Sequence, residues 1–423
     1  GADPSNKSSA GKSYVVFGKA NSSAIDLSAI ADASNPTGGF VINGEAENDG
    51  SGFSVSSAGD VNGDGLDDLI VGANGADPSN KSNAGKSYVV FGKANSSAIN
   101  LSAIADASNP TGGFVINGEA ENDRSGYSAS SAGDVNGDGL DDLIVGSFFA
   151  DPSGKLSAGK SYVVFGKANS SAINLSAIAN TSNPTGGFVI NGEAAIDYSG
   201  VSVSSAGDVN GDGLDDLIVG AFHADPSGKS NAGKSYVVFG KANSSAIDLS
   251  AIADASNPTG GFVINGEAAG DASGWSVSSA GDVNGDGLDD LIVGADGADP
   301  SGKSNAGKSY VIFGKTDTDA IDLAKLGGDS KYAINYLGDK NANTLTGTSN
   351  DEIFVAGAGD DTLTGNGGMD VFNAGSGKDS ILINASNISA LEQTGAGNRA
   401  RVDGGGGVDT LKLDGAGLTL DLT

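Results

Sequence analysis

The chain has 423 residues, of which 69 are glycine and only 6% are aromatic, a composition that argues against large conventional hydrophobic cores. It contains no cysteine and a single histidine, which excludes disulfides and histidine-rich zinc or copper sites. The formal net charge of −30 disfavours nucleic acid and anionic membranes as partners. No apolar run approaches the roughly 18 residues needed to cross a bilayer, so we expect no membrane insertion. The composition favours divalent cations bound through oxygen ligands.

A repeat of 74 residues covers residues 1–337. The string DVNGDGLDDLIVG begins at Asp60, Asp134, Asp208 and Asp282, and SYVVFGK recurs five times, as SYVIFGK in the last copy. We divide this region into a half unit at residues 1–50 and units that begin at about residues 51, 125, 199 and 273.

Four short strands are predicted in each unit, at FSVSSAGD, DLIVGA, SYVVFG and GGFVINGE, from their alternation, β-branched residues and glycine-rich boundaries. We expect them to pair up-and-down as an antiparallel sheet, with one helical turn in the long connection between the third and fourth strands. Repeated four-stranded units predict an all-β fold of β-propeller blades. A linear all-β array or a set of unrelated β-sandwiches are the alternatives.

The loop DVNGDGLDD places oxygen-bearing side chains at positions 1, 3, 5 and 9, with glycine at position 6, as in loops that wrap a calcium ion. Three carboxylates in nine residues repel one another unless a cation lies between them. This is not an EF-hand, because position 12 is Val71 rather than glutamate and a strand follows instead of a helix. Magnesium, which demands a small octahedral site, fits less well, and an acidic turn without metal is the alternative.

We therefore predict about one calcium ion for each loop, with four side chains and the position-7 backbone carbonyl as ligands. The predicted ligands are Asp60, Asn62, Asp64, Leu66 and Asp68 in the first copy; Asp134, Asn136, Asp138, Leu140 and Asp142 in the second; Asp208, Asn210, Asp212, Leu214 and Asp216 in the third; and Asp282, Asn284, Asp286, Leu288 and Asp290 in the fourth.

From about Gly338 the repeat period falls to nine residues. The frames GTSNDEIFV, AGAGDDTLT, GNGGMDVFN and AGSGKDSIL approximate the pattern G-G-x-G-x-D-x-U-x, which predicts a short parallel β-roll with further calcium ions at residues 338–382. Residues 383–423 are predicted to be irregular, with a loop at 383–403 and an isolated fifth match, GGGGVDTLK, from Gly404.

The 74-residue units resemble FG-GAP repeats, the units of the integrin α-subunit propeller and of many bacterial surface proteins. The resemblance rests on the acidic loop between the first and second strands, on VFG (Phe17-Gly18 in the first copy) and on GADP (residues 75–78), and it covers roughly residues 1–337. Propellers of this family commonly close with seven blades, whereas this sequence has four calcium-bearing units and a half unit, which leaves ring closure open.

The nonapeptide frames resemble the RTX β-roll of secreted bacterial proteins, in which the sixth-position aspartate holds calcium between turns. This resemblance implies metal ligands at Asp361, Asp370, Asp379 and Asp409, while Glu352 departs from the pattern. Together the two resemblances imply an extracellular or cell-surface location and a secreted, adhesin-like bacterial protein.

Signatures of catalysis are weak, and we predict that the chain is not an enzyme. Three copies contain a formal phosphate-binding loop, from Gly154, Gly228 and Gly302, but a predicted strand follows where a helix is required. We find no G-x-S-x-G elbow, and one histidine makes a Ser-His-Asp triad improbable.

Differences among the copies cluster in the fourth-to-first and second-to-third strand connections, which an up-and-down blade places on the face opposite the acidic loops. The variable residues that we predict to contact a partner are Phe148, Phe149, Tyr198, Phe222 and His223. Alternatively, these side chains pack under a neighbouring blade.

We therefore predict a calcium-binding extracellular module that mediates adhesion through the face without calcium. Its partner would be a cell-surface protein, a glycan or a second copy of the chain. A surface-layer lattice protein and a non-catalytic appendage of a larger secreted enzyme are the alternatives.

Overall fold

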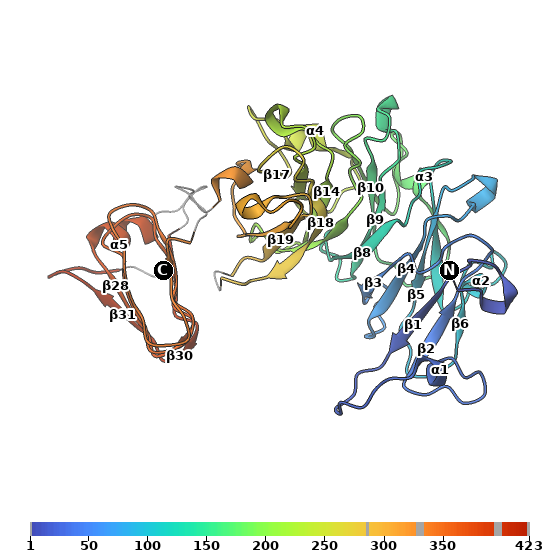
Figure 1. Ribbon diagram of the computed structural model, residues 1–423, viewed down its shortest axis with the longest axis horizontal. Helices are drawn as coiled ribbons and strands as arrows, with labels where there is room; N and C mark the ends of the chain where they lie inside the picture. The colour runs from blue at the N-terminus through green and yellow to red at the C-terminus, as the bar shows by residue number, and fades with distance from the viewer. Residues whose placement is uncertain (1, 285–286, 327–333, 393–399, 421–423) are drawn as a thin grey trace.

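The computed structural model describes residues 2–284, 287–326, 334–392 and 400–420 (Figure 1). Each complete unit forms an antiparallel sheet in which the four strands pair in chain order. The strands are β3 (Ser54–Gly59), β4 (Asp68–Ala73), β5 (Lys86–Val90) and β7 (Gly113–Asn117) in the first unit; β8 (Ser128–Gly133), β9 (Asp142–Ser147), β10 (Lys160–Val164) and β12 (Gly187–Asn191) in the second; and β13 (Val203–Gly207), β14 (Asp216–Ala221), β15 (Lys234–Val238) and β17 (Gly261–Asn265) in the third. The four predicted strands and their up-and-down order are confirmed in these three units, whereas the region expected to hold the fourth strand of the last unit falls largely outside the described residues.

Shorter sheets flank these three within the described residues. The half unit contributes β1 (Lys12–Val16) and β2 (Gly39–Asn43), and the fourth unit contributes β18 (Ser273–Gly281), β19 (Asp290–Ala295) and β20 (Lys308–Ile312). Figure 1 shows these sheets side by side in an arc, with the sheet of β1 and β2 and the sheet of β18 and β19 at its two ends.

The long connection between the third and fourth strands of each complete unit pairs with the sheet of the preceding unit. A two-residue strand in this connection pairs in parallel with the fourth strand of the preceding sheet, and a short helix follows it. These strands are β6 (Ile99–Asn100), β11 (Ile173–Asn174), β16 (Ile247–Asp248) and β21 (Ile321–Asp322), and the helices of the connections are α1 (Leu27–Ile30), α2 (Leu101–Ile104), α3 (Leu175–Ile178), α4 (Leu249–Ile252) and the 3-10 helix η6 (Leu323–Lys325). The predicted helical turn is confirmed.

A single 3-10 turn precedes the third strand of each unit: η1 (Pro4–Asn6), η2 (Pro78–Asn80), η3 (Pro152–Gly154), η4 (Pro226–Gly228) and η5 (Pro300–Gly302). The formal phosphate-binding loops lie here, and each leads into a strand, so no helix N-terminus is available to face a phosphate. Among the helices of the described residues, none has the length and apolar character of a membrane span.

Hydrophobic cores form between neighbouring sheets. Tyr162 and Val164 of β10 pack against the first unit, whereas Val163 packs against the third, because successive side chains of a strand point to opposite faces. Tyr162 and its counterparts Tyr88 and Tyr236 have no exposed surface. Each blade thus buries both faces only when it has neighbours, which is the packing expected of propeller blades.

Each of these interfaces also carries a polar tie. Glu119 of one unit accepts hydrogen bonds from the Lys160 ammonium, at 2.7 Å, and from the Tyr162 hydroxyl of the next unit. The same tie recurs at Glu45, Glu193 and Glu267. A salt bridge of this kind at every interface fixes the position of each blade relative to the next.

The nonapeptide frames form a parallel roll in which strands alternate between two sheets. One sheet contains β22 (Tyr336–Leu337), β24 (Ile353–Val355), β26 (Val371–Asn373) and β29 (Arg401–Asp403), and the other contains β23 (Thr344–Thr346), β25 (Thr362–Thr364), β28 (Ser380–Ile383) and β31 (Thr410–Leu413). The short strands β27 (Ser376–Gly377) and β30 (Gly406–Gly407) pair at a turn. Phe354 stacks between Tyr336 and Phe372 in the core, and the predicted β-roll is confirmed.

The loop predicted at residues 383–403 is wrong over two stretches. Helix α5 (Ala385–Leu391) is preceded by the N-cap residue Asn384, whose side chain accepts hydrogen bonds from the amides of Ser386 and Asn387 in a capping box. Strand β29 then pairs in parallel with β26, and β31 pairs with β28. The match from Gly404 is therefore not isolated, because it forms the next turn of the roll.

Candidate metal centres and an aromatic band

The acidic loops join the first and second strands of each unit, as predicted. In the first copy, the Asp60 carboxylate accepts hydrogen bonds from three backbone amides of its own loop. Oδ1 accepts from Gly63 at 2.8 Å and from Asp64 at 3.0 Å, and Oδ2 accepts from Gly65 at 2.8 Å. Gly65 adopts φ +85°, which side-chain-bearing residues rarely adopt. Position 7, Leu66, lies at the exposed tip of the loop.

The position-9 aspartate is the first residue of the second strand and is fully buried in every copy. In the second copy, Asp142 accepts hydrogen bonds from the amides of Gly166 at 2.8 Å and Val135 at 3.2 Å, and from the Asn136 side chain at 3.3 Å. The side chain at position 3 therefore contacts the carboxylate at position 9. In the fourth copy Asp286 lies outside the described residues.

Burial raises the pKa of these closing aspartates. Desolvation is the largest cause, and the nearby carboxylates of positions 1 and 5 raise it further. The pKa is about 8 for Asp142 and Asp216 and about 6 for Asp68. An ionised carboxylate in this position needs a compensating cation, so the donor set fits a hard divalent ion.

The described residues do not bring three acidic groups together at a point that could hold a metal. The carboxylates of positions 1 and 5 instead accept backbone amides of their own loop, and in the first three copies the side chains of positions 3 and 9 contact each other. The ligand sets predicted for the loops therefore remain a prediction, supported by the oxygen-only donors and the buried closing carboxylate.

The position-8 aspartate has a role that sequence reasoning missed. The Asp141 carboxylate accepts a hydrogen bond from the Asp60 amide of the preceding loop at 2.7 Å, and Asp215 and Asp289 repeat this contact with the loops before them. A Cβ at Gly59 would lie 2.3 Å from Asp141 Oδ2, so glycine is required beside it. Adjacent acidic loops are therefore physically coupled.

In the roll, the sixth-position aspartates stack from turn to turn. Asp379 Oδ1 accepts from the Asp361 amide at 2.7 Å, and Asp409 Oδ1 accepts from the Asp379 amide at 2.9 Å. Asp361 and Asp379 are each only 1% exposed, and their Oδ2 atoms are buried without a hydrogen-bond partner. A buried, unpartnered carboxylate oxygen is what a calcium ligand requires, so these residues fit the ion.

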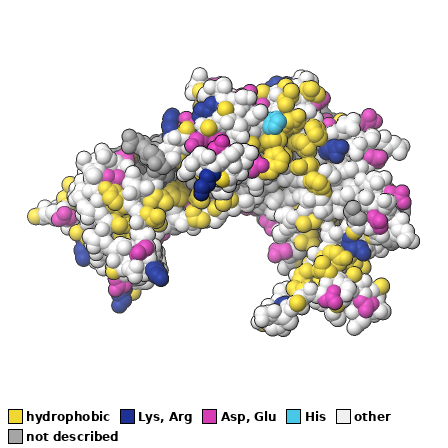
Figure 2. Space-filling model, viewed as in Figure 1, with side chains coloured by type: hydrophobic (Ala, Val, Ile, Leu, Met, Phe, Trp, Pro, Cys, Tyr) yellow, Lys and Arg dark blue, Asp and Glu magenta, His cyan; other side chains and the backbone are white. Residues whose placement is uncertain are grey.

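Aromatic side chains from the variable connections and from the starts of the first strands form a continuous band across the units. We define the aromatic band as Phe53, Tyr127, Phe148, Phe149, Tyr198, Phe222, His223 and Trp275. Each ring lies near the next, with centroids 4.7 Å apart for Phe53 and Tyr127, 4.4 Å for Tyr127 and Phe148, 5.8 Å for Tyr198 and Phe222, and 4.6 Å for Phe222 and Trp275. Figure 2 shows hydrophobic side chains gathered beside the single histidine.

Phe148 is only 9% exposed, so for this residue the alternative holds in which the side chain packs within the protein instead of contacting a partner. Its ring contacts the rings of Tyr127, Phe149 and Tyr198, so it forms a buried part of the band. Phe53 and Trp275, which are 56% and 44% exposed, were missed. The signal that could have found them is the variable residue after Ser-Gly at the start of each first strand.

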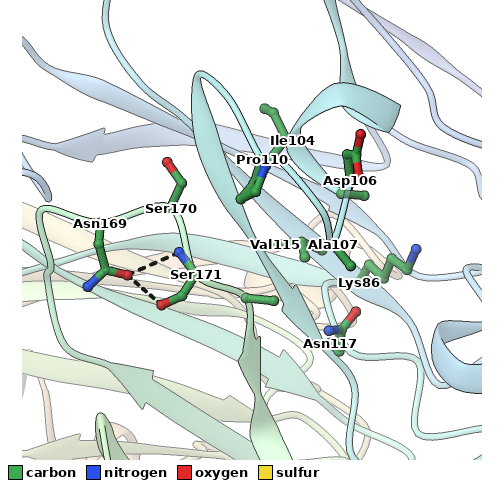
Figure 3. A pocket seen from close by; sticks show the side chains of 12 residues that line it. Lys86, Ile104, Asp106, Ala107, Pro110, Val115, Asn117, Asn169, Ser170 and Ser171 are labelled. Atoms are coloured by element: carbon green, nitrogen blue, oxygen red, sulfur yellow. Dashed lines mark hydrogen bonds between the residues drawn. The ribbon is translucent and has the colours of Figure 1, made fainter.

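A cavity of about 700 Å³ lies between the long connections of neighbouring units (Figure 3). Asn169 Oδ1 accepts hydrogen bonds from the Ser171 amide and hydroxyl on one wall. The charged residues of the lining are Lys86, which pairs with Glu45, and Asp106, which accepts from Ser108. Both are engaged in local structure, so this cavity offers no evident acid–base pair for catalysis.

Comparison with known proteins agrees with this structure. A family model described as the FG-GAP repeat matches residues 51–90, 125–164, 199–238 and 273–312, and one described as the RTX calcium-binding nonapeptide repeat matches residues 346–381. Integrin alpha pat-2 of Caenorhabditis elegans is 32% identical over 234 residues, which are 49% of this chain and 16% of the relative.

Two further relatives are similar over shorter stretches. Integrin alpha-PS2 of Drosophila melanogaster is 33% identical over 122 residues, covering 27% of this chain and 8% of the relative. Integrin alpha-IIb of Mus musculus is 31% identical over 170 residues, covering 39% and 14%. The chain thus spans only a small part of these curated relatives. It contains four FG-GAP repeats similar to those of integrin alpha chains, followed by RTX calcium-binding nonapeptide repeats.

Proposed function

We propose that the chain is an extracellular adhesion module in which calcium orders the acidic loops and the roll, and the aromatic band binds a cell-surface protein or glycan. The proposed ligands are the residues predicted above for the loops, together with Asp361, Asp379 and Asp409 in the roll. Calcium would supply positive charge that offsets the buried carboxylates. Millimolar extracellular calcium would fill sites with dissociation constants of about 0.1–1 mM.

The observation that carries the adhesive part of this proposal is the aromatic band. In the second and third units a residue of the band follows the second strand, while the acidic loop lies where that strand begins: Asp142 is the first residue of β9 and Phe148 follows its last, and Phe222 follows β14 in the same way. The strand separates the two sites by about 20 Å. Calcium would therefore stabilise the blades that present the band without contacting the ligand.

Phe222 and Trp275 are suited to contact a partner. Their rings pack edge to face, Trp275 is 44% exposed, and they come from adjacent units. Aromatic side chains contribute large apolar area at low entropic cost and dominate binding energy in many interfaces. The single tryptophan also provides a spectroscopic probe of the site.

The proposal is tested by measuring attachment of the labelled chain to cells and to immobilised glycoproteins in millimolar calcium. Phe222→Ala combined with Trp275→Ala is expected to weaken attachment at least about 30-fold, because even one ring that anchors an interface contributes about 2 kcal/mol. Leu156→Ala is the control, since this side chain is 61% exposed and lies outside the band. Unchanged attachment by the double variant would refute the assignment of the band.

We further infer that the chain acts by binding rather than catalysis. Its single histidine, His223, lies in the aromatic band between Tyr198 and Phe222. The acidic pairs of the repeats are engaged in the loops and in contacts between units. These features support a binding role.

A further inference from the structure

The roll carries two rows of acidic residues, one before the strands of each sheet. Asp361, Asp379 and Asp409 precede β25, β28 and β31, and we call them the first row. Glu352 and Asp370 precede β24 and β26, and we call them the second row. In both rows a carboxylate oxygen accepts the backbone amide of the acid one full turn earlier, at 2.7 Å for Asp379 and 2.9 Å for Asp370. The contact between a carboxylate and the backbone of the preceding turn is therefore the same in the two rows.

They differ in the remaining carboxylate oxygens. In the first row, Oδ2 of Asp361 and of Asp379 is buried without a partner. In the second row, Asp370 Oδ2 accepts a hydrogen bond from the Asn387 side-chain amide at 2.8 Å, and the Glu352 carboxylate accepts from the Thr348 amide at 2.8 Å and from its hydroxyl. The carboxylates of the second row, in which Glu352 replaces the aspartate of the pattern, thus accept hydrogen bonds from donors of the protein itself.

Asn387 belongs to helix α5, which interrupts the nonapeptide register. The stacked acids of the first row are 18 residues apart at Asp361 and Asp379 but 30 apart at Asp379 and Asp409, because the chain forms the helix between them. The helix lies against the glycine-rich turn of Asp370: Asn387 Oδ1 accepts from the Gly367 amide at 3.1 Å.

The Asn387 amide lies between two oxygens of the kind that a calcium ion would contact. Its Nδ2 donates to Asp370 Oδ2 and approaches the Gly368 carbonyl oxygen at 3.4 Å. The side chain is 1% exposed, and a Cβ at Gly365 would lie 2.6 Å from Asp370 Oδ2 and 2.9 Å from Asn387 Nδ2. The space beside Asp370 is therefore filled by a hydrogen-bond donor that also fixes the turn.

We propose that the roll binds calcium along the first row only, and that helix α5 replaces the ion on the second row with the Asn387 amide. This inference rests on the proposed calcium binding and assigns Asp370 a structural role instead of the ligand role that its frame implies. A consequence is that the turn of Asp370 stays ordered at calcium concentrations that leave the first row unfilled. Helix α5 thus stabilises the turn of Asp370 without calcium, within a roll whose first row depends on calcium.

Ion counting on the full chain tests this directly. Bound calcium is measured at saturation for the native chain and for two isosteric variants, Asp379→Asn and Asp370→Asn. We expect Asp379→Asn to lose about one ion per chain and Asp370→Asn to lose none. An equal loss from both variants, a loss from Asp370→Asn alone, or a loss from neither would overturn the proposal.

A second measurement does not depend on the folding of a variant. Hydrogen exchange of the native chain is compared with and without chelator for peptides covering residues 365–373 and 374–383. We expect chelation to speed exchange in the second peptide at least about tenfold and to leave the first unchanged. Equal acceleration of exchange in the two peptides would contradict a turn of Asp370 that is held by Asn387 in place of calcium.

Asn387→Asp provides the converse test, because it places a second carboxylate beside Asp370. We expect this variant to gain about one calcium ion and its 365–373 peptide to become chelator-sensitive. An unchanged ion count with native-like exchange in chelator would contradict the proposal. Attachment through the aromatic band is read separately with the Phe222 and Trp275 double variant, so failure here is distinguishable from failure of the adhesive function.

Discussion

Replacing Asp142 with asparagine should change the stability of the chain in opposite directions with and without calcium. The carboxyl is fully buried, and burial raises its pKa to about 8 from an ordinary value of 3.8. Without metal at pH 7, folding must neutralise a group that is ionised in the unfolded chain. That neutralisation costs about 4 kcal/mol at pH 7, from the difference between this pH and the ordinary pKa.

Asparagine removes this cost but introduces a new one. Its amide nitrogen would face donors, since the Val135 amide and the Asn136 side chain both donate to the Asp142 carboxylate. An unsatisfied buried donor costs about 1–3 kcal/mol, so the net gain without calcium is about 1–3 kcal/mol at pH 7. Because the folded pKa is raised, the carboxyl stabilises the fold at acid pH and loses that contribution as pH rises from about 4 to about 8. The gain should therefore shrink or reverse at pH 5.

With calcium the sign reverses, because asparagine is a weaker ligand than a carboxylate. Losing one ion held at a hundredfold excess over its dissociation constant removes about 2.7 kcal/mol of stabilisation. The assay is the urea midpoint followed by far-ultraviolet circular dichroism, in chelator and in calcium at about a hundredfold excess over the dissociation constant, which is about 10 mM calcium for a constant of about 0.1 mM. Asp106→Asn is the control, since Asp106 is exposed and bonded to Ser108. A shift of the same sign in calcium and in chelator would refute the reasoning.

Three further predictions concern the contacts between units and are read from unfolding midpoints in calcium. Asp215→Ala should lower stability by about 1–3 kcal/mol, because it removes the acceptor that joins two acidic loops; an unchanged midpoint would mean that the loops are independent. Gly159→Ala should cost more than about 3 kcal/mol, since its φ is +84° and a Cβ would lie 1.9 Å from the Ser199 carbonyl oxygen; near-native stability would contradict this packing. Glu193→Gln should cost about 1–3 kcal/mol by breaking the ion pair with the largely buried Lys234, and a stabilised variant would show that the pair is dispensable.

The blades could be predicted from the sequence because local and global signals agree. In SYVVFG, the alternation that buries Tyr162 on one face and Val163 on the other is visible in the residues themselves. The exact spacing of the units then fixes the boundaries of each strand. The acidic loops were located for the same reason, since every copy places its aspartates between the same two strands.

Contacts between different units could not be predicted in this way. The Asp141 side chain bonds to a loop of the preceding unit, and nothing in DGLDD shows that its second aspartate points away from its own loop. The aromatic band depends likewise on residues from successive units, and Phe53 and Trp275 become part of it only through neighbouring blades. These contacts follow from the tertiary arrangement.

Helix α5 was missed because loss of the nonapeptide pattern resembles a loop. Its start signal is Asn384 with Asn387 three residues later, a weaker capping box than one with glutamate or glutamine. Burial of Asn387 against Asp370 stabilises it, and that contact lies 17 residues away in the sequence.

The central claim is that calcium holds the acidic loops and the roll together. The most direct measurement is the thermal unfolding midpoint of the full chain, with the bound metal counted, before and after exhaustive chelation. We predict a midpoint at least about 5 °C higher with calcium, restored when the ion is returned. A chain that retained no calcium after chelation and unfolded at the same temperature would contradict the account.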